Sequence, residues 1–482
     1  MKQHGVFPSV GLEIHLELKT NTKMFCGCGN DSSEMHPNVH ICEVCTGQPG
    51  TLPVLNKQAV ISALKLIKAL DGHVEEVSSF ERKNYFYPDL PKGYQISQYE
   101  IPIGSSGGLN IVLSDKELGT SKRVRLRRIH MEEDTGRLVH TQTGESLVDF
   151  NRSGRPLLEI VTEPDMHTAD EAKAFAQELI LLIRYLGVSD ANPEKGEIRL
   201  EANISVSETE GELGTKVEVK NLNSLRALHG SIEYEIKRHA KALKDKEKLV
   251  QETRGWDEGK QRTFSQRTKE HAQDYRYFPE PDLPPLILNK DIIGEAHLPE
   301  LPAHKRTRFQ NEFNLSYTES DQLVNNKEVA SFFEEAVSEF KDAGGSDVRL
   351  LFNYAVNDLV GLLAKYEKIF VDIQLSPHVF AHLITRLEKG EFTSKIVKNI
   401  LIEAVERAEN VEVLMNSRNK VSDEGELKNI IEEVLQKNEK AVTDYKKGKQ
   451  ASFEFLIGQV MAHTRGRADS DVVRSLLQTF LS

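Results

Sequence analysis

The chain has no long apolar run, and this absence excludes a membrane-spanning helix. Such a helix needs about 18 or more consecutive apolar residues, and no stretch of that kind occurs. Residues 1–5 are polar and lead into no apolar segment, so they do not read as a secretory signal. We therefore expect a cytoplasmic protein that makes no membrane contact.

Two nucleotide-binding motifs are also missing. The sequence contains neither GxxxxGK(S/T), which cradles phosphates in P-loop proteins, nor GxGxxG, which opens the Rossmann dinucleotide site. Any ATP chemistry would therefore need another architecture.

Positive charge is in deficit. Lys and Arg total 62 against 74 Asp and Glu, which gives a net charge of −12. This balance excludes a generally nucleic-acid-seeking surface but permits a local basic patch. Any contact with RNA would have to be regional.

Cysteine is scarce, and the four present lie close together: Cys26, Cys28, Cys42 and Cys45. Two close pairs separated by a loop suit a tetrahedral, structural zinc site. The first pair is CxC rather than the commoner CxxC, so free thiols remain an alternative, and His36 or His40 could replace a ligand. Four sulfur ligands would leave no thiol as a nucleophile.

The patterns that are present predict an α+β protein of about three domains. We place them at residues 1–293 (with a cysteine knuckle at 24–47), 294–410 and 411–482. The proline-dense segment 270–286 cannot continue a strand or helix and ends the first domain. The other two domains should be all-helical, with one helix beginning at Ser376-Pro377 and stopped by Gly390.

Strict alternation of apolar and polar residues predicts strands at residues 10–18, 199–206 and 217–220. Helical spacing predicts helices at 59–70, 168–187 and 222–246. The strands indicate a largely antiparallel sheet that is covered on one face and open on the other. On the open face we expect Glu13, His15, Glu201, Glu218 and Lys220 to meet. Such a face fits a divalent cation held by oxygen ligands, and magnesium carries phosphates.

Two charged segments each have two interpretations. The basic run 122–128, followed by the acids at 132–134, is either a solvated loop or part of a site for cations and phosphates. Residues 80–95 interleave aromatics with cations around two prolines, which indicates a loop that stacks on a base or merely plugs the domain edge. Glu159 stands alone in an apolar strand and needs a partner.

The C-terminal tail gathers basic residues beside glycines: Lys446, Lys447, Lys449, Arg465 and Arg467. Clustered cations next to turns can touch an RNA backbone. The alternative is an ordinary solvated surface.

Several long blocks, in order, resemble the B-subunit family (GatB/GatE) of the glutamyl-tRNA(Gln)/aspartyl-tRNA(Asn) amidotransferases. They are GLEIH at 11–15, RKNYFYPD at 82–89, YQISQ at 94–98, HMEED at 130–134, PLLEI at 156–160, KNLNS at 220–224 and DYRYFPEP at 274–281, with GQVM at 458–461 in the tail. The resemblance covers nearly the whole chain. It implies a cradle-like N-terminal domain on the antiparallel sheet, followed by a helical domain and a tRNA-binding helical tail.

The resemblance also implies an activity and partners. The family uses ATP to phosphorylate the side-chain carboxylate of Glu-tRNA(Gln) or Asp-tRNA(Asn), and ammonia then forms the amide. The ammonia comes from glutamine, hydrolysed by an amidase-type A subunit, and a small C subunit completes a heterotrimer. Nothing in the chain itself suggests glutamine hydrolysis, which agrees with a separate glutaminase.

By position, the resemblance implies a magnesium set of Glu13, His15, Glu133 and Glu159, with Glu218 nearby. It implies a phosphate or intermediate contact for Lys220 and a phosphate contact for Arg152, and it supports zinc at the four cysteines. The sequence departs from the family pattern at Glu201, where aspartate is expected, and at Leu225, where an aromatic residue is expected. We therefore rank Glu201 below the other acids.

Two other functions are compatible with the sequence. The chain could be a non-catalytic tRNA-binding scaffold whose acids hold only structural metals. It could also be a magnesium-dependent phosphohydrolase of small molecules, which would need neither tRNA nor partner subunits. The archaeal E subunit of the same family would carry an inserted domain, for which the chain has no room before the tail.

Overall fold

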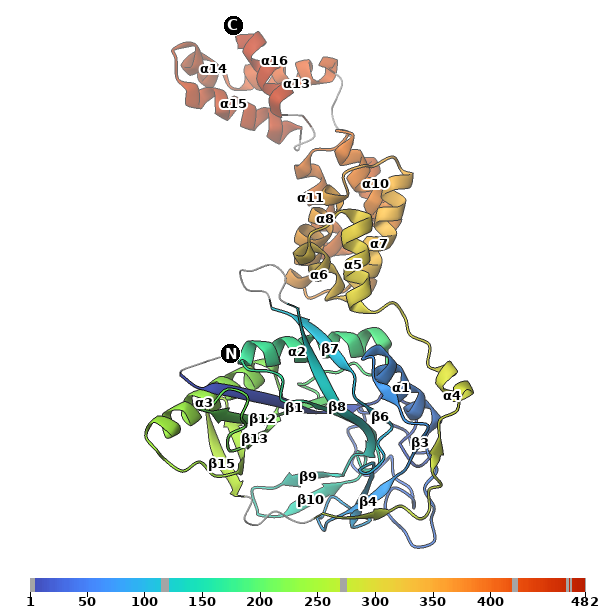
Figure 1. The fold of residues 1–482 in the computed structure, drawn as a ribbon. Helices are drawn as coiled ribbons and strands as arrows, with labels where there is room; N and C mark the ends of the chain where they lie inside the picture. Colours follow the sequence, from blue (N-terminus) through green and yellow to red (C-terminus); the bar gives the residue numbers. More distant parts are fainter. Residues whose placement is uncertain are drawn as a thin grey trace. The chain divides into compact units, whose positions relative to one another are not determined.

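The computed structural model describes residues 5–113, 121–268, 275–417, 424–464, 468 and 470–481. The chain forms two compact units, Met1–Leu301 and Pro302–Ser482. The first unit is mixed α+β and the second is helical, as expected from the sequence (Figure 1). The division of the helical part near residue 410 stays a prediction.

The first unit is built on one large sheet, to which 13 strands of the described residues belong. Its main path runs β15 (Arg262–Thr268), β14 (Glu252–Asp257), β13 (Val217–Leu222), β12 (Ile198–Ser207), β1 (Phe7–Glu17), β11 (Pro156–Thr162), β8 (Ser121–Glu133), β5 (Tyr94–Ser97), β4 (Glu81–Asn84) and β16 (Arg276–Pro279). β6 (Gly104–Ser105) and β7 (Gly108–Val112) pair with β8, and β2 (His73–Val74) pairs with β6. Along the main path only β13 and β14 pair in parallel, so the sheet is largely antiparallel as predicted.

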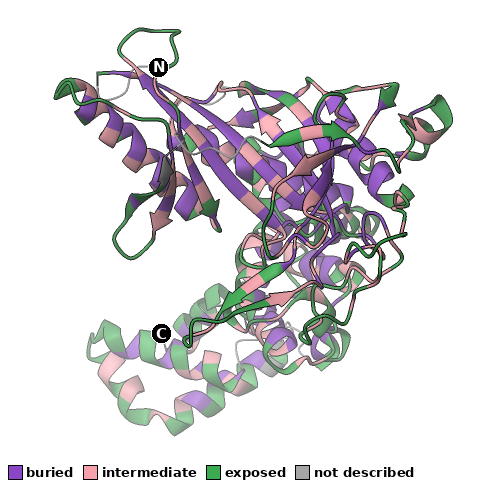
Figure 2. Ribbon diagram, turned by 90° about the horizontal axis from the view of Figure 1, so that it is seen from below, coloured by how far each residue is buried: buried purple, intermediate pink, exposed green. Residues whose placement is uncertain are grey.

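Two small sheets complete the unit. β9 (Arg137–His140) pairs with β10 (Ser146–Asp149), and β3 (Val77–Ser78) pairs with β17 (Leu286–Ile287). Residues in the central strands of the large sheet are mostly buried, as Figure 2 shows. A functional site on this sheet therefore requires a strand face that carries polar side chains.

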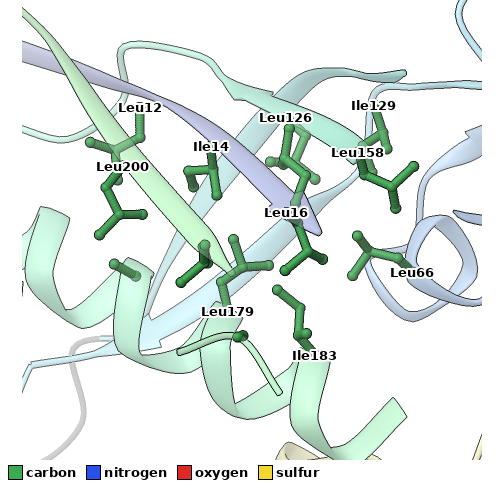
Figure 3. Packing of buried hydrophobic residues seen from close by; sticks show 14 of the residues in the cluster. Leu12, Ile14, Leu16, Leu66, Leu126, Ile129, Leu158, Leu179, Ile183 and Leu200 are labelled. Atoms are coloured by element: carbon green, nitrogen blue, oxygen red, sulfur yellow. The ribbon is translucent and has the colours of Figure 1, made fainter. Parts of the chain in front are cut away.

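Helices cover the apolar face of the sheet. They are α1 (Lys57–Ala69), α2 (Ala169–Leu186) and α3 (Leu225–Lys244). Leu179 and Ile183 of α2 pack towards Leu16 and Leu200 of the central strands (Figure 3). Burial of each such side chain stabilises the fold by about 1.5–3 kcal/mol. The inward side chains of β1 are those that its alternating sequence predicts.

Each covering helix begins at a polar residue whose side chain accepts backbone hydrogen bonds. Asn56 caps α1, Thr168 caps α2 and Ser224 caps α3. α2 ends at Gly187, whose φ of 68° is favourable only for a residue without a side chain. All three helices agree with the predicted ones, and local capping explains why they begin where they do.

Two segments that the sequence indicated as loops contribute strands. Residues 80–95 include β4 and the start of β5, and the proline-dense segment 270–286 includes β16, which pairs with β4. Arg82 of β4 stacks on Tyr94 at 4.4 Å and donates to Glu280 at 2.8 Å. These cross-strand contacts outweigh the local turn signals of proline and glycine, so the loop interpretation was wrong for these residues.

The basic run 122–128 and the acids at 132–133 belong to β8, so the solvated-loop interpretation was also wrong. Arg125 and Arg127 point outwards and form two-pronged pairs with Asp165 and Glu163. Val124 beside them is fully buried. A strand with this many charged residues is stable here because salt bridges pair the arginine side chains on its exposed face.

The first unit ends with α4 (Lys290–Glu295). The second unit contains α5 (Pro302–Phe313), α6 (Tyr317–Val324), α7 (Lys327–Asp342), α8 (Val348–Asn353), the π-helix η2 (Tyr354–Val360), α9 (Gly361–Lys365), the 3₁₀ turn η3 (Phe370–Asp372), α10 (Pro377–Glu388), α11 (Ser394–Arg407), α12 (Val411–Ser417), α13 (Glu424–Lys437), α14 (Glu439–Lys446), α15 (Gln450–His463) and α16 (Ser470–Leu481). The predicted Ser376 cap and Gly390 stop of α10 are both present. In the described part of the chain, no helix has the length and apolarity that crossing a membrane requires.

Candidate functional site

Three rows of side chains cross the polar face of the central strands. Paired residues on neighbouring strands point to the same face, and so do residues two apart on one strand. The register therefore groups His130, Glu159, His15 and Arg199; Arg128, Val161, Glu13 and Glu201; and Gly11, Asn203, Glu218 and Thr253. Segments far apart in the sequence thus supply one polar surface.

A first cluster of oxygen atoms is formed by Glu13, Glu201 and Glu218, whose ligand atoms lie within 4.8 Å of one another. Lys220 Nζ lies 2.8 Å from Glu201 Oε2 and 3.2 Å from Glu218 Oε1. Thr253 donates its hydroxyl hydrogen to Glu218 at 3.0 Å. Three converging carboxylates with one balancing ammonium can hold a hard divalent cation through oxygen ligands.

The charges of this first cluster are strongly coupled. Burial raises the pKa of Glu13 to about 7, and repulsion from Glu159 and Glu201 adds to the shift. Burial acts to lower the pKa of Lys220, but attraction to Glu201 and Glu218 outweighs it and the net shift is upward. A cation placed among these carboxylates would relieve their mutual repulsion.

A second cluster joins two histidines to two carboxylates. His15 Nε2 lies 3.4 Å from Glu159 Oε2 and 3.7 Å from Glu132 Oε1. His130 Nε2 lies 3.2 Å from Glu159 Oε2 and 3.8 Å from Glu132 Oε2, and its Nδ1 has no partner among the described residues. Two overlapping sets can each hold a metal ion: Glu13, His15 and Glu159, and His130, Glu132 and Glu159. Because Glu13 belongs both to the first cluster and to one of these sets, the two clusters form one continuous site.

The protonation of the two histidines in the second cluster follows from their pairing with Glu132 and Glu159. Burial opposes the charged form of His15, but the hydrogen bond to Glu159 and attraction to Glu132 raise its pKa to about 9. Burial likewise opposes charge on His130, and Glu159 and Glu132 again raise the pKa to about 9. Metal-free, both imidazoles are therefore cationic at neutral pH, and a metal ion would displace their protons.

Most of the residues predicted for the site do meet there. Glu13, His15, Glu159, Glu218 and Lys220 belong to the two clusters. Glu201, which we ranked lower, lies in the first cluster beside Glu13. His130 and Glu132 were missed, although both stand in the HMEED block and at alternate positions of β8.

Glu133 does not join either cluster. It contacts Lys92, accepts the backbone hydrogen of Ile96 at 2.9 Å and is 3% exposed. Arg152 is also elsewhere, because its guanidinium donates to the carbonyl oxygens of Thr135 at 3.0 Å and Gly136 at 2.7 Å. Glu133 thus lies apart from the other residues of the predicted magnesium set, and the phosphate contact expected for Arg152 stays a prediction.

A cavity of about 430 Å³ opens beside Glu13 on the polar face. Its lining includes Gly11, Tyr99, Arg127, Arg128, Thr162, Asn203 and Lys216. Two buried polar atoms that line it, Arg128 Nε and Asn203 Oδ1, have no hydrogen-bond partner among the described residues. Arg128 also lies over the ring of Tyr99 at 5.5 Å, and Tyr99 stacks on Tyr277 at 4.3 Å. A donor and an acceptor left unsatisfied in one cavity indicate a place for a polar ligand.

The four cysteines come together as predicted. The sulfur atoms of Cys26, Cys28, Cys42 and Cys45 lie within 4.8 Å of one another, and all four are free thiols. A tetrahedral ion with metal–sulfur bonds of about 2.3 Å would need sulfurs about 3.8 Å apart, so the donor set fits such an ion. The four cysteines can therefore bind a metal, without a position left open for water.

The predicted tail residues are only partly described. Lys446 ends α14, and Lys447 and Lys449 follow it on the exposed surface. Arg465 and Arg467 lie outside the described residues. A hollow of about 670 Å³ beside α14 is lined by Lys437, Lys440, Lys449 and Phe455, among others. Phe455 is 47% exposed, and sequence reasoning missed it because a phenylalanine in an apolar helix normally indicates core.

Comparison with known proteins gives the family. The family model described as the GatB/GatE catalytic domain matches residues 8–294, and the model described as the GatB domain matches residues 331–481. A relative from Carboxydothermus hydrogenoformans is 43% identical over 482 residues and covers 98% of each chain. Relatives from Rippkaea orientalis (44% identical, 97% of this chain and 96% of the other) and Thermus thermophilus (43% identical, 97% of each) are similar over the same extent.

All three relatives are named as the B subunit of an aspartyl/glutamyl-tRNA(Asn/Gln) amidotransferase. The matched regions include both the polar face of the sheet and the helical tail. The resemblance seen in the sequence blocks is thereby confirmed over nearly the whole length. The chain belongs to the GatB/GatE family of amidotransferase B subunits.

Proposed function

We propose that this chain is the B subunit of a glutamine-dependent, tRNA-dependent amidotransferase, a ligase that forms a carbon–nitrogen bond. Its reaction would be the ATP-dependent phosphorylation of the side-chain carboxylate of Glu-tRNA(Gln), Asp-tRNA(Asn) or both, followed by amidation. The products would be Gln-tRNA(Gln) and Asn-tRNA(Asn) for translation. The observation that carries the proposal is the convergence of Glu13, His15, Glu159 and Glu201 on one open face of the sheet.

The chemistry needs charge neutralisation more than proton transfer. A carboxylate oxygen of the aminoacyl side chain attacks the terminal phosphorus of ATP, and the bond from that phosphorus to the bridging oxygen breaks as ADP leaves. The attacking carboxylate is already an anion at neutral pH, so no general base is required. Catalysis then depends on positioning and on cations around the transferring phosphoryl group.

The first cluster has the donors for magnesium. Glu13, Glu201 and Glu218 would hold the ion, which when bound neutralises phosphate charge. Lys220 is placed to contact a phosphate oxygen or the acyl phosphate once the ion has taken over its carboxylate partners. His15, His130 and Glu159 would complete or orient the coordination.

The cavity beside Glu13 supports a nucleotide at this site. Its apolar and aromatic lining suits a nucleoside, and its volume lies in the usual range of about 300–1,000 Å³ for small-ligand sites. Asn203 Oδ1 would accept from an amino or hydroxyl group of the nucleoside. Arg128 Nε would donate to a phosphate oxygen, and the phosphates would then lie towards Glu13.

Ammonia must come from a partner. In the second step ammonia attacks the acyl carbon, the carbon–oxygen bond to phosphate breaks, and one proton leaves with the phosphate. The four thiols of this chain are grouped in one cluster, which leaves no cysteine for glutamine hydrolysis. We propose an amidase-type A subunit as the glutaminase and a small C subunit as the third member of a heterotrimer.

The remaining parts of the chain receive structural and binding roles. The four cysteines would hold a structural zinc ion, since their sulfurs lie within 4.8 Å of one another and four thiolates are a usual ligand set for zinc. The helical tail would bind tRNA through Lys446, Lys447 and Lys449, together with Arg465 and Arg467.

The decisive experiment is reconstitution with the A and C subunits. Each misacylated tRNA is supplied with ATP, magnesium and glutamine, and formation of the amidated tRNA is followed. We expect amidation to require all components and to fall at least a hundredfold in the Glu159→Gln variant. Amidation that survives this change while tRNA binding is unaltered would favour a non-catalytic scaffold. ATP hydrolysis that needs no tRNA or partner subunits would favour a phosphohydrolase.

A further inference from the structure

Lys23 is a lysine whose side chain is wholly buried. It is 0% exposed and stands among the largest fully buried side chains of the protein. Its ammonium donates to the carbonyl oxygen of His40 at 2.6 Å and to that of Phe150 at 3.2 Å. The third neighbour of Nζ is Cys45 Sγ, at 3.6 Å.

The charge of this ammonium requires an anionic partner. Burying an unpaired ammonium costs several kcal/mol, and carbonyl dipoles offset only part of that cost. No described carboxylate forms an ion pair with Lys23, so the nearest group that can carry negative charge is the Cys45 sulfur. The four sulfurs form one group, so the ammonium of Lys23 interacts with the net charge of all four.

A metal-bound state of the cysteines supplies the required charge. Four thiolates around a divalent ion carry two negative charges in excess, whereas four neutral thiols carry none. One ammonium hydrogen-bonded to a ligand sulfur compensates half of that excess. Hydrogen bonds from outside the ligand shell also fix the orientation of the ligand, as they do at other metal sites.

Lys23 in addition connects the knuckle (residues 24–47) to the loop at residues 149–154, whose first residue is the last of β10. Phe150 belongs to this loop, and its neighbour Asn151 accepts from the backbone of Val39 at 2.7 Å and of His40 at 2.9 Å. Ser153 donates to the carbonyl oxygen of Cys45 at 3.2 Å. The loop leads directly into β11, which carries Glu159.

We propose that Lys23 is a charge-compensating and positioning residue of the four-cysteine metal site, and that metal binding holds the loop 149–154 against the knuckle through it. This role lies outside the amidation chemistry and does not depend on it. The contacts of Lys23 are with His40, Cys45 and Phe150 and not with the two carboxylate clusters, so we assign it no catalytic role.

The first test measures metal affinity in the full chain. Zinc binding is determined by competition with a chelator for the wild type, Lys23→Met and Lys23→Gln. We expect Lys23→Met, which keeps the length but removes the charge, to weaken zinc binding about 10–100-fold. Lys23→Gln retains donors without charge and should be intermediate. The matched control is Lys19→Met, because Lys19 lies four residues away with its side chain 65% exposed and paired with Asp190.

Affinity of Lys23→Met within twofold of the wild type would overturn the proposal. A second measurement uses only the wild-type chain and so does not depend on a variant that folds. Hydrogen exchange of residues 149–154 is compared before and after zinc is removed by chelation. Faster exchange in this loop with no change in α3 is expected, and unchanged exchange in the loop would refute its coupling to the metal site.

Discussion

Glu132 and Glu133 are consecutive residues of β8, yet their carboxylates have opposite surroundings. Glu132 lies 3.7 Å from His15 and 3.8 Å from His130, on the polar face. Glu133 instead contacts Lys92 and accepts the backbone hydrogen of Ile96. Successive side chains of a strand point to opposite faces, so only one of the two acids can belong to the candidate site.

This difference predicts opposite phenotypes for two equivalent changes. Glu132→Gln removes a charge that His15 and His130 share, and it should lower ATP-dependent amidation at least tenfold with a smaller loss of stability. Glu133→Gln breaks the buried pair with Lys92 and should lower the free energy of unfolding by about 1–3 kcal/mol. Single-turnover amidation and urea denaturation measure the two effects. The reverse ranking in both assays would show that Glu133, not Glu132, serves the site.

Glu13 gives the metal-free protein a specific pH dependence. Its folded pKa of about 7 lies above the ordinary value of 4.5, so the folded state holds a proton that the unfolded state releases. The corresponding stability is present below about pH 4.5 and is lost as pH rises to about 7. In magnesium-free buffer, Glu13→Gln should therefore be more stable than the wild type at pH 8, by up to about 3 kcal/mol. Urea denaturation at pH 5 and pH 8 tests this.

Added magnesium should make the wild type more stable than Glu13→Gln at pH 8. Ion binding needs the deprotonated carboxylate, so added magnesium stabilises the wild type at pH 8 and has little effect on Glu13→Gln. Equal magnesium stabilisation of both proteins would remove Glu13 from the ion site.

The resemblance to the family, and not the strand pattern, assigned Glu133 to the magnesium set, and the geometry of β8 explains why its side chain faces away from the two clusters. Before Arg127, the even-numbered residues Val124 and Leu126 of β8 are buried in the core. The pairing with β11 then skips Arg127, because Val161 pairs with Arg128 and Thr162 with Leu126. This bulge exchanges the two faces of the strand. Without the bulge, alternation continued from Leu126 would place Glu133 on the polar face. With the bulge, Glu132 lies on the polar face and Glu133 on the opposite one.

In β1 and β12 the sequence alone was sufficient to predict which face each side chain occupies. β1 and β12 alternate without interruption, so the pattern of their residues alone places Glu13, His15 and Glu201 on one face. The helices with clear caps were also predictable. The cavity beside Glu13 was not, because it depends on how Tyr99 and Asn203, distant in sequence, come together.

The cavity makes a prediction about ATP. Arg128→Gln removes the Nε–H group, which has no acceptor among the described residues. A hydrogen bond from it to a charged phosphate would contribute about 1.5–3 kcal/mol. The apparent KM for ATP should therefore rise at least tenfold, while KM for the misacylated tRNA changes little. Arg125→Gln is the matched control, since Arg125 is on the same strand but pairs outwards with Asp165. A similar effect of both substitutions would contradict a specific role for Arg128.

Substitutions at Gly11 that add side chains of increasing size test whether the nucleotide binds in this cavity. A methyl group at Gly11 would lie 3.7 Å from its nearest neighbours, Pro164 and Thr162, which is an ordinary contact. Gly11→Ala should therefore fold normally, whereas the larger side chain in Gly11→Val occupies space that a nucleoside needs. We expect direct nucleotide binding to weaken stepwise from wild type to Ala to Val. Unchanged binding in both variants would place the nucleotide elsewhere.

The exposed lysines of the tail should affect tRNA and not glutamine. Lys446→Glu with Lys449→Glu reverses two charges beside the hollow that Lys437 and Phe455 line. Each lost phosphate contact reduces both the affinity and its dependence on salt, so tRNA binding should weaken and its salt slope become shallower. The tRNA-independent glutaminase activity of the assembled complex should stay unchanged, because we propose that it resides on the A subunit. Lys365→Glu with Lys395→Glu, an equal change of charge at two exposed lysines of α9 and α11, controls for net charge. If the double variant lost both activities together, the tail would be maintaining the assembly instead of binding tRNA.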